Sequence, residues 1–260
     1  MNAWRKIGEN SSEAVILAVD FDSAARPEAR FPAFAARVRP AAELWLTAQP
    51  DNAEREFLTA QTYLEFWAKR PPGRVEALVG FCVGCVFLPA LADQIERIQG
   101  SRPALLLIDP ERVVTSSILR DFSNTVGGMA VLTDAEREAA ISEARSLCDS
   151  AGDDFASAAT GVVKLYEATA GIAFDRLGLD DETSEDLMGL FRSYVSYLLA
   201  AHTLIPKPTR AAGVALTSAQ FRSGAMHATS ERSFPVGTES MLDDERVAEA
   251  ARAFFQGVLR

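Results

Sequence analysis

The chain has 260 residues, 48% of them hydrophobic, which is enough to build a sizeable core in one large α/β domain. Its 36 acidic residues outnumber its 26 Lys and Arg residues, and this net charge of −10 argues against partners such as nucleic acid or an anionic membrane. We expect no signal peptide and no membrane-spanning helix, because no apolar run reaches the ~18 residues that such a helix needs.

The first half of the chain alternates between strand and helix patterns. The predicted strands are apolar runs bounded by polar or turn residues, and they cover 14–21, 42–48, 74–80 and 103–109. Helices are predicted from about 52 to 69, where apolar residues recur with a 3.6-residue period, and from 85 to about 98. This alternation predicts a mostly parallel sheet covered by helices on both faces.

The second half begins with a block that is almost entirely helical in pattern. Thr133 and Glu136 predict a capping box that opens a helix through about Cys148. Further helices are predicted within 153–178 and from near Ser184. A block of helices between two strands is an insertion, which either adds packing or covers a site as a lid.

Strand character returns at the end of the chain. An apolar run over 212–218 predicts another strand, and a final helix is predicted from about Asp243. The resulting domain organisation has three parts. These are a first core segment, a helical lid insertion and a last core segment, at 1–132, 133–205 and 206–260.

A nucleophile elbow is the strongest chemical signal in the sequence. Gly80-Phe81-Cys82-Val83-Gly84 lies between a predicted strand and a predicted helix, where Gly-x-nucleophile-x-Gly presents a reactive side chain on a sharp turn. The glycines are needed because side chains beside the nucleophile would clash with the adjoining strand and helix. The turn also places Cys82 at a helix N-terminus, where the N–H of Val83 is the expected oxyanion donor.

An acidic residue ends the next predicted strand. Asp109 follows Cys82 by one predicted helix and one predicted strand. Because the carboxyl ends of parallel strands meet at one edge of a sheet, where ligands bind, we expect Asp109 near Cys82. The alternative is a structural role for Asp109 in the turn before Pro110.

The cysteines and histidines are few. Cys82 and Cys85 form a C-x-x-C pair, which also occurs in thioredoxin-like redox proteins, and Cys148 is the third cysteine. This small, odd number indicates reduced thiols in a cytoplasmic protein. The two histidines, His202 and His227, are too few for a metal cluster. We rank the redox hypothesis last, because the elbow explains the turn more simply.

Three segments and the helical insertion carry a family resemblance. The segments are VEALVGFCVG (Val75–Gly84), LLLIDPE (Leu105–Glu111) and VGTESMLDDERVAEAARAF (Val236–Phe254). With them, the chain resembles the thioesterases of nonribosomal peptide and polyketide synthesis. The resemblance implies an α/β-hydrolase fold with a helical lid, with Cys82 in the position of the nucleophile and Asp109 in that of the acid.

The chain departs from this family at two positions. The family has a catalytic histidine shortly before a Met-Leu pair and the last helix, and matching Met241-Leu242 to that pair places Thr238 at the histidine. The family also follows its first strand with a His-Pro or glycine-rich oxyanion loop. Here the sequence is Asp20-Phe21-Asp22-Ser23-Ala24-Ala25, which leaves Phe21 or Asp22 as the positional candidate for the second oxyanion donor.

A cysteine nucleophile depends less on a base than a serine does. Its ordinary pKa of about 8.5 leaves a few per cent as thiolate at neutral pH, and a helix N-terminus increases that fraction. We therefore predict acyl transfer, cyclisation or release of a carrier-bound acyl or peptidyl thioester through a Cys82 acyl-enzyme. The implied partners are an acyl or peptidyl carrier protein or synthetase module and a small acyl substrate. Phosphopantetheine belongs to the carrier, and no cofactor or metal is expected in the chain itself.

Two other functions stay open at this stage. A non-catalytic thioesterase-like protein would bind a carrier domain or an acyl chain, or would act as a scaffold, with Cys82 as an ordinary buried residue. A hydrolase with a relocated base would use His227, His202 or Glu239 instead of a residue at position 238. For either histidine, the structural alternative is an ordinary surface residue.

Overall fold

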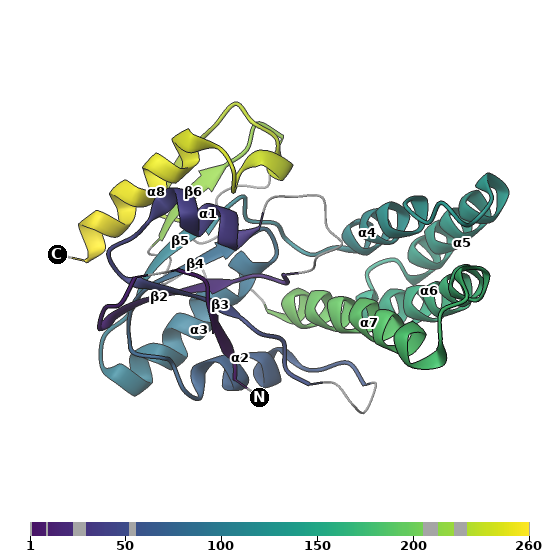
Figure 1. The fold of residues 1–260 in the computed structure, drawn as a ribbon, viewed down its shortest axis with the longest axis horizontal. Helices are drawn as coiled ribbons and strands as arrows, with labels where there is room; N and C mark the ends of the chain where they lie inside the picture. Colours follow the sequence, from purple (N-terminus) through teal and green to yellow (C-terminus); the bar gives the residue numbers. More distant parts are fainter. Residues whose placement is uncertain are drawn as a thin grey trace. The chain divides into compact units, whose positions relative to one another are not determined.

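A computed structural model describes residues 2–8, 10–22, 30–51, 56–204, 213–220 and 228–259. The chain divides into two compact units (Figure 1). The sheet unit comprises Met1–Asp51, Ala60–Arg112 and Leu204–Arg260, and the helical unit comprises Asn52–Thr59 and Val113–Thr203. The predicted insertion at 133–205 lies almost wholly in the helical unit, which also includes residues on its N-terminal side.

The sheet has the order β1-β3-β2-β4-β5-β6-β7 within the described residues. Its strands are β1 (Trp4–Lys6), β2 (Ala14–Val19), β3 (Glu43–Thr47), β4 (Arg74–Phe81), β5 (Ala104–Ile108), β6 (Gly213–Thr217) and β7 (Ser230–Ser233). Every neighbouring pair is parallel except β1 and β3. The predicted mostly parallel sheet is therefore confirmed.

Helices cover both faces of this sheet, as predicted (Figure 1). Helices α1 (Phe31–Val38) and α8 (Glu245–Val258) lie on one face, and α2 (Ala60–Ala68) and α3 (Gly84–Gln99) lie on the other. The two pairs shield the central strands from water on both sides, which explains why those strands are continuous apolar runs.

Each face has its own apolar core. Under α1 and α8, the buried rings of Phe34 and Phe255 pack with inward side chains of the central strands. Under α2 and α3, the rings of Tyr63, Trp67 and Phe87 form an aromatic cluster with centroids 5.1 to 5.9 Å apart. These cores fix strand β4 and helix α3, and therefore the turn that joins them.

The helical unit contains α4 (Thr115–Gly127), α5 (Asp134–Ala151), α6 (Phe155–Leu177) and α7 (Asp181–Thr203). The predicted capping box is present, because Thr133 Oγ1 accepts from Glu136 N and the Glu136 carboxylate accepts from Thr133 N. Arg176 of α6 also donates to both carboxylate oxygens of Glu136, and chiefly this contact lowers the pKa of Glu136 to about 2.

One predicted helix begins later than expected. The helix expected from about residue 52 starts at Ala60, and residues 56–59 are not helical. The amide of Leu58 donates instead to Ser196 Oγ at 2.8 Å, so this short segment belongs to the helical unit. A tertiary contact therefore overrides the helical pattern.

Among the described residues, the elements that were not predicted are β1, α1, α4, β7 and a short 3-10 helix, η2 (Thr238–Ser240). Strands β1 and β7 are only 3 and 4 residues long, and every residue of β7 is exposed, so neither carries an apolar pattern. Among the helices of the described residues, none is long and apolar enough to cross a membrane.

Candidate active site

Strand register brings the predicted site residues to one edge of the sheet. Val19 pairs with Gly80, Phe81 pairs with Ile108, and Ile108 pairs with Leu216. The residues just beyond these pairs, at the carboxyl ends of their strands, are Phe21, Cys82, Asp109 and Ser218. This is the edge where open α/β sheets bind ligands, and it confirms that Cys82 and Asp109 leave adjacent strands side by side.

The backbone is strained at both of these residues. Cys82 has φ 51° and Asp109 has φ 48°, values in the left-handed region that residues other than glycine rarely adopt. Such a conformation costs about 1–3 kcal/mol and is found where the surrounding structure enforces it. At Cys82 it produces the sharp strand-to-helix turn that the elbow motif predicts.

Gly80 is needed for this turn to form. A Cβ on Gly80 would lie 2.8 Å from both the Cα and the N of Cys85, closer than real Cβ contacts. These are backbone atoms of α3 that cannot rotate away. The absence of a side chain at position 80 therefore allows helix α3 to start directly against strand β4.

Asp109 is fully buried and accepts hydrogen bonds from two other segments. Its Oδ1 accepts from the amide of Ser218 at 2.8 Å, and its Oδ2 accepts from Thr238 Oγ1 at 2.5 Å. The hydroxyls of Ser218 and Thr238 are themselves 3.3 Å apart. Thr238, which the family resemblance places at the position of the catalytic histidine, thus contacts Asp109, but its hydroxyl supplies no base.

The thiol of Cys82 contacts a different carboxylate. Its Sγ donates to Glu111 Oε2 at 3.0 Å, and the amide of Glu111 donates to the carbonyl oxygen of Cys82 at 3.2 Å. Sequence reasoning gave Glu111 no role, although it lies in the Leu105–Glu111 segment that carries the family resemblance. The available signal was a second carboxylate two residues after Asp109, at the same edge of the sheet.

The two predicted oxyanion donors follow the neighbouring strands β4 and β2. Val83 directly precedes α3, and its amide donates no hydrogen bond to any other described residue. Phe21 follows β2 and is buried, with 5% of its surface exposed. The amide of Val83 is therefore placed as a donor at the start of a helix, where backbone N–H groups point outward.

Of the three candidate bases, the structure describes His202 and Glu239. His227 lies outside the described residues. His202, at the end of α7, places Nδ1 3.0 Å from the carbonyl oxygen of Val113 and stacks on Phe155. Glu239 is exposed. The described residues thus place the hydroxyl of Thr238, rather than an imidazole, against the Asp109 carboxylate.

The two thiols of the C-x-x-C pair lie in different environments. Neither forms a disulfide, and Cys82 is partly exposed whereas Cys85 is fully buried. The Cys85 Sγ is directed at the carbonyl oxygen of Ile108, and burial raises the pKa of this thiol well above its usual range. Cys85 is therefore an inert core thiol, which argues against a redox pair.

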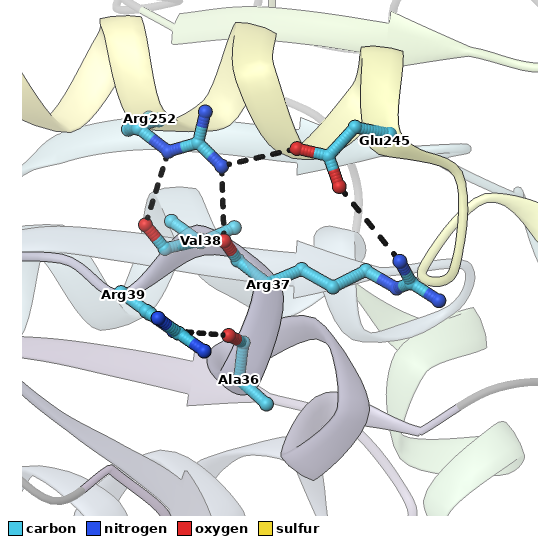
Figure 2. Close-up of a pocket in the computed structure, with 6 residues that line it drawn as sticks. All are labelled: Ala36, Arg37, Val38, Arg39, Glu245 and Arg252. Atoms are coloured by element: carbon cyan, nitrogen blue, oxygen red, sulfur yellow. Dashed lines mark hydrogen bonds and ion pairs between the residues drawn. The ribbon is translucent and has the colours of Figure 1, made fainter.

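A pocket of about 520 Å³ lies between α1 and α8, away from these residues (Figure 2). It is lined by Ala36, Arg37, Val38, Arg39, Glu245 and Arg252. Arg252 donates to the carbonyl oxygens of Arg37 and Val38 at 2.9 and 3.3 Å, and pairs with Glu245 at 3.3 Å. Arg252 therefore satisfies carbonyls at the C-terminal end of α1 and joins that end to α8.

Arg252→Met should lower the free energy of unfolding by about 1–2 kcal/mol, because two helix-end carbonyls lose their donor. Urea unfolding followed by circular dichroism measures this change. Arg97→Met is the matched control, since Arg97 donates to the carbonyl oxygen of Asp93 within α3 and bonds to no second element among the described residues. An equal effect of the two substitutions would contradict the role of Arg252.

Comparison with known proteins supports the fold. No protein-family model and no curated protein sequence matches the chain. Solved structures do match, among them the Vlm2 thioesterase domain bound with a dodecadepsipeptide, at a TM-score of 0.57 and 15% identity over 98% of this chain and 97% of that one.

Two further thioesterases are similar over nearly their whole length. The NocB thioesterase domain from the nocardicin cluster has a TM-score of 0.52 and 16% identity, covering 99% of this chain and 98% of that one. YbtT, a type II thioesterase from the yersiniabactin pathway, has a TM-score of 0.52 and 12% identity, covering 99% and 97%. With the sheet order above, these similarities show that the chain has an α/β-hydrolase fold.

Proposed function

We propose that this protein transfers, cyclises or releases acyl or peptidyl groups held as thioesters, through an acyl-enzyme formed on Cys82. The observation that carries the proposal is the elbow itself. Cys82 lies on a left-handed turn at the start of α3, with its thiol partly exposed and the Val83 amide beside it. A nucleophile and an oxyanion donor on one sharp turn is the arrangement used for acyl transfer.

The substrate that fits this chemistry is a thioester on the phosphopantetheine arm of an acyl or peptidyl carrier protein or synthetase module. Fold similarity to thioesterase domains of natural-product biosynthesis supports this choice. Replacement of one thioester by another is close to thermoneutral, so a cysteine can take up the acyl group reversibly. The reaction would occur in the cytoplasm, where thiols stay reduced.

The reaction balances as two acyl transfers. First, a bond forms between Cys82 Sγ and the acyl carbon, the bond from that carbon to the carrier sulfur breaks, and the Cys82 thiol proton passes to the departing carrier thiolate. Second, an amine, thiol or water attacks the acyl carbon, and Cys82 leaves as a thiol with the proton of the attacking group. An amine is the better acceptor, because it is itself a good nucleophile.

Intact-protein mass spectrometry with an acyl thioester donor tests this proposal. The wild-type protein should gain the mass of one acyl group, and Cys82→Ala should gain none. Cys148→Ala is the matched control, because Cys148 is buried and burial raises its thiol pKa, so its loss should leave the adduct unchanged. No wild-type adduct, or an equal adduct on Cys82→Ala, would reject the acyl-enzyme.

One observation favours a second candidate function, a binding protein without catalysis. The carboxylate of Asp109 accepts from Thr238 and Ser218, so it orients no histidine within the described residues. Under this alternative, a carrier or acyl chain would bind without forming an adduct. Binding of an acylated carrier protein with the same affinity by wild type and Cys82→Ala, without any adduct, is the result that would support it.

A further inference from the structure

Glu111 is held against the nucleophile at two points. Asp109 adopts a left-handed conformation after β5, and Pro110 follows it, so the chain turns back toward β4. The amide of Glu111 then donates to the Cys82 carbonyl oxygen at 3.2 Å, and its Oε2 lies 3.0 Å from the Cys82 thiol sulfur. The backbone contact thus fixes the residue whose carboxylate accepts the hydrogen bond from the thiol.

Asp109 is not available for the same task. It is fully buried, and its two oxygens already accept hydrogen bonds from Ser218 N and Thr238 Oγ1. Glu111 is only partly buried, and its carboxylate lies at the edge where Cys82 is exposed. The acid that structural analogy assigns to catalysis and the acid that contacts the nucleophile are therefore different residues.

We propose that Glu111 is the general base of this site and replaces the histidine that position 238 lacks. The proposal deepens and rests on the proposed acyl transfer at Cys82. A candidate base must lie within hydrogen-bond reach of the proton that it takes, and the contact between Sγ and Oε2 satisfies this condition. Glu111 contacts the reacting atom directly, whereas the Asp109 carboxylate accepts from Ser218 and Thr238.

The proton route follows from this contact. As Cys82 Sγ attacks the thioester carbon, its proton moves to Glu111 Oε2, and the carboxylic acid then gives that proton to the departing carrier thiolate, which leaves as a thiol. In the second transfer, the regenerated carboxylate takes a proton from the attacking amine, thiol or water. Glu111 returns this proton to Sγ as the acyl–sulfur bond breaks, so each cycle ends with a thiol and a carboxylate.

The carboxylate has a second, opposite effect that makes the proposal testable. A negative charge beside a thiol disfavours the thiolate, because the two anions repel each other. Alkylation by iodoacetamide depends on the thiolate alone, whereas acyl transfer also needs a group that moves protons. Removing the charge should therefore change the two reactions in opposite directions.

Glu111→Gln keeps the size of the side chain and removes its basicity. We expect the rate of acyl-enzyme formation, followed by intact-protein mass spectrometry, to fall at least ~10-fold. Iodoacetamide alkylation of Cys82 at neutral pH should be equal or faster in the same variant. Glu249→Gln, an exposed acid on α8, is the control that should change neither rate.

One further variant tests whether Glu111 acts as a base. Glu111→Asp retains a carboxylate and should recover part of the acyl-transfer rate. If wild type forms an adduct and Glu111→Gln forms it equally fast, Glu111 is not the base. If both reactions slow together, Glu111 only maintains the local structure. If wild type forms no adduct, the proposed function fails first.

Discussion

Thr238→His should raise the hydrolysis of acyl thioesters by about 10²-fold, the lower end of what a positioned general base contributes. The Thr238 hydroxyl already lies 2.5 Å from Asp109 Oδ2, so this position can present a hydrogen-bond donor to the acid. An imidazole there would donate through one ring nitrogen and leave the other as a base. Asp109 would then orient a histidine, the role that such an acid has in a catalytic triad.

The gain should appear chiefly in the step that uses water. Water is a weak nucleophile and needs a base more than an amine does, so the lifetime of the acyl-enzyme should shorten. Release of the free acid, measured by liquid chromatography with an acyl N-acetylcysteamine thioester, reports this step. Thr238 is partly exposed, which leaves room for the larger ring.

Asp109→Asn in the Thr238→His background is the control for this prediction. Asparagine has a similar shape but lacks the negative charge that stabilises the imidazolium, so most of the gain should disappear. A folded Thr238→His variant with wild-type hydrolysis would contradict the prediction. It would show that position 238 does not present a base to the Cys82 thioester.

Gly80→Ala should lower the free energy of unfolding by about 3 kcal/mol, which is at the upper end of the cost of overpacking a core. The added Cβ would approach the Cys85 Cα and N to 2.8 Å, so strand β4 and helix α3 would have to separate. For a chain of this size, such a loss corresponds to a fall in Tm of about 6–12 °C.

Thermal unfolding followed by circular dichroism measures this effect. Gly257→Ala is the matched control, because its Cβ would meet no atom within 4 Å and it lies in α8 of the same unit. That substitution should leave Tm unchanged or raise it slightly, since alanine favours a helix over glycine. Equal Tm values for the two variants would show that the close approach at position 80 is not tight.

The two predictions separate the fold from the chemistry. Gly80→Ala changes how β4 and α3 pack, so its effect should appear in stability whether or not the protein is an enzyme. Thr238→His changes only which groups face Asp109, so its effect should appear in turnover. If Gly80→Ala lowers the stability but the wild-type protein never forms a Cys82 adduct, the chain has the α/β-hydrolase fold without acyl-transfer activity.

Local patterns predicted the sheet core well. Strands β2, β4 and β5 were predicted because each is a continuous apolar run. Burial on both faces of a parallel sheet produces that pattern. Strand β7 has no such pattern, because all four of its residues are exposed. The helix expected from residue 52 began later, since a contact from Leu58 to Ser196 overrides the local periodicity.

The sequence by itself determined the alternation of strands and helices, the Cys82 elbow and the position of Asp109 on the next strand. These features depend on residue spacing within short segments, which the pattern of apolar residues and glycines records. Only the tertiary structure decided which groups those residues contact. Asp109 meets Thr238, and Cys82 meets Glu111. Both contacts depend on left-handed turns and on the pairing of distant segments, and neither leaves a periodic signal in the chain.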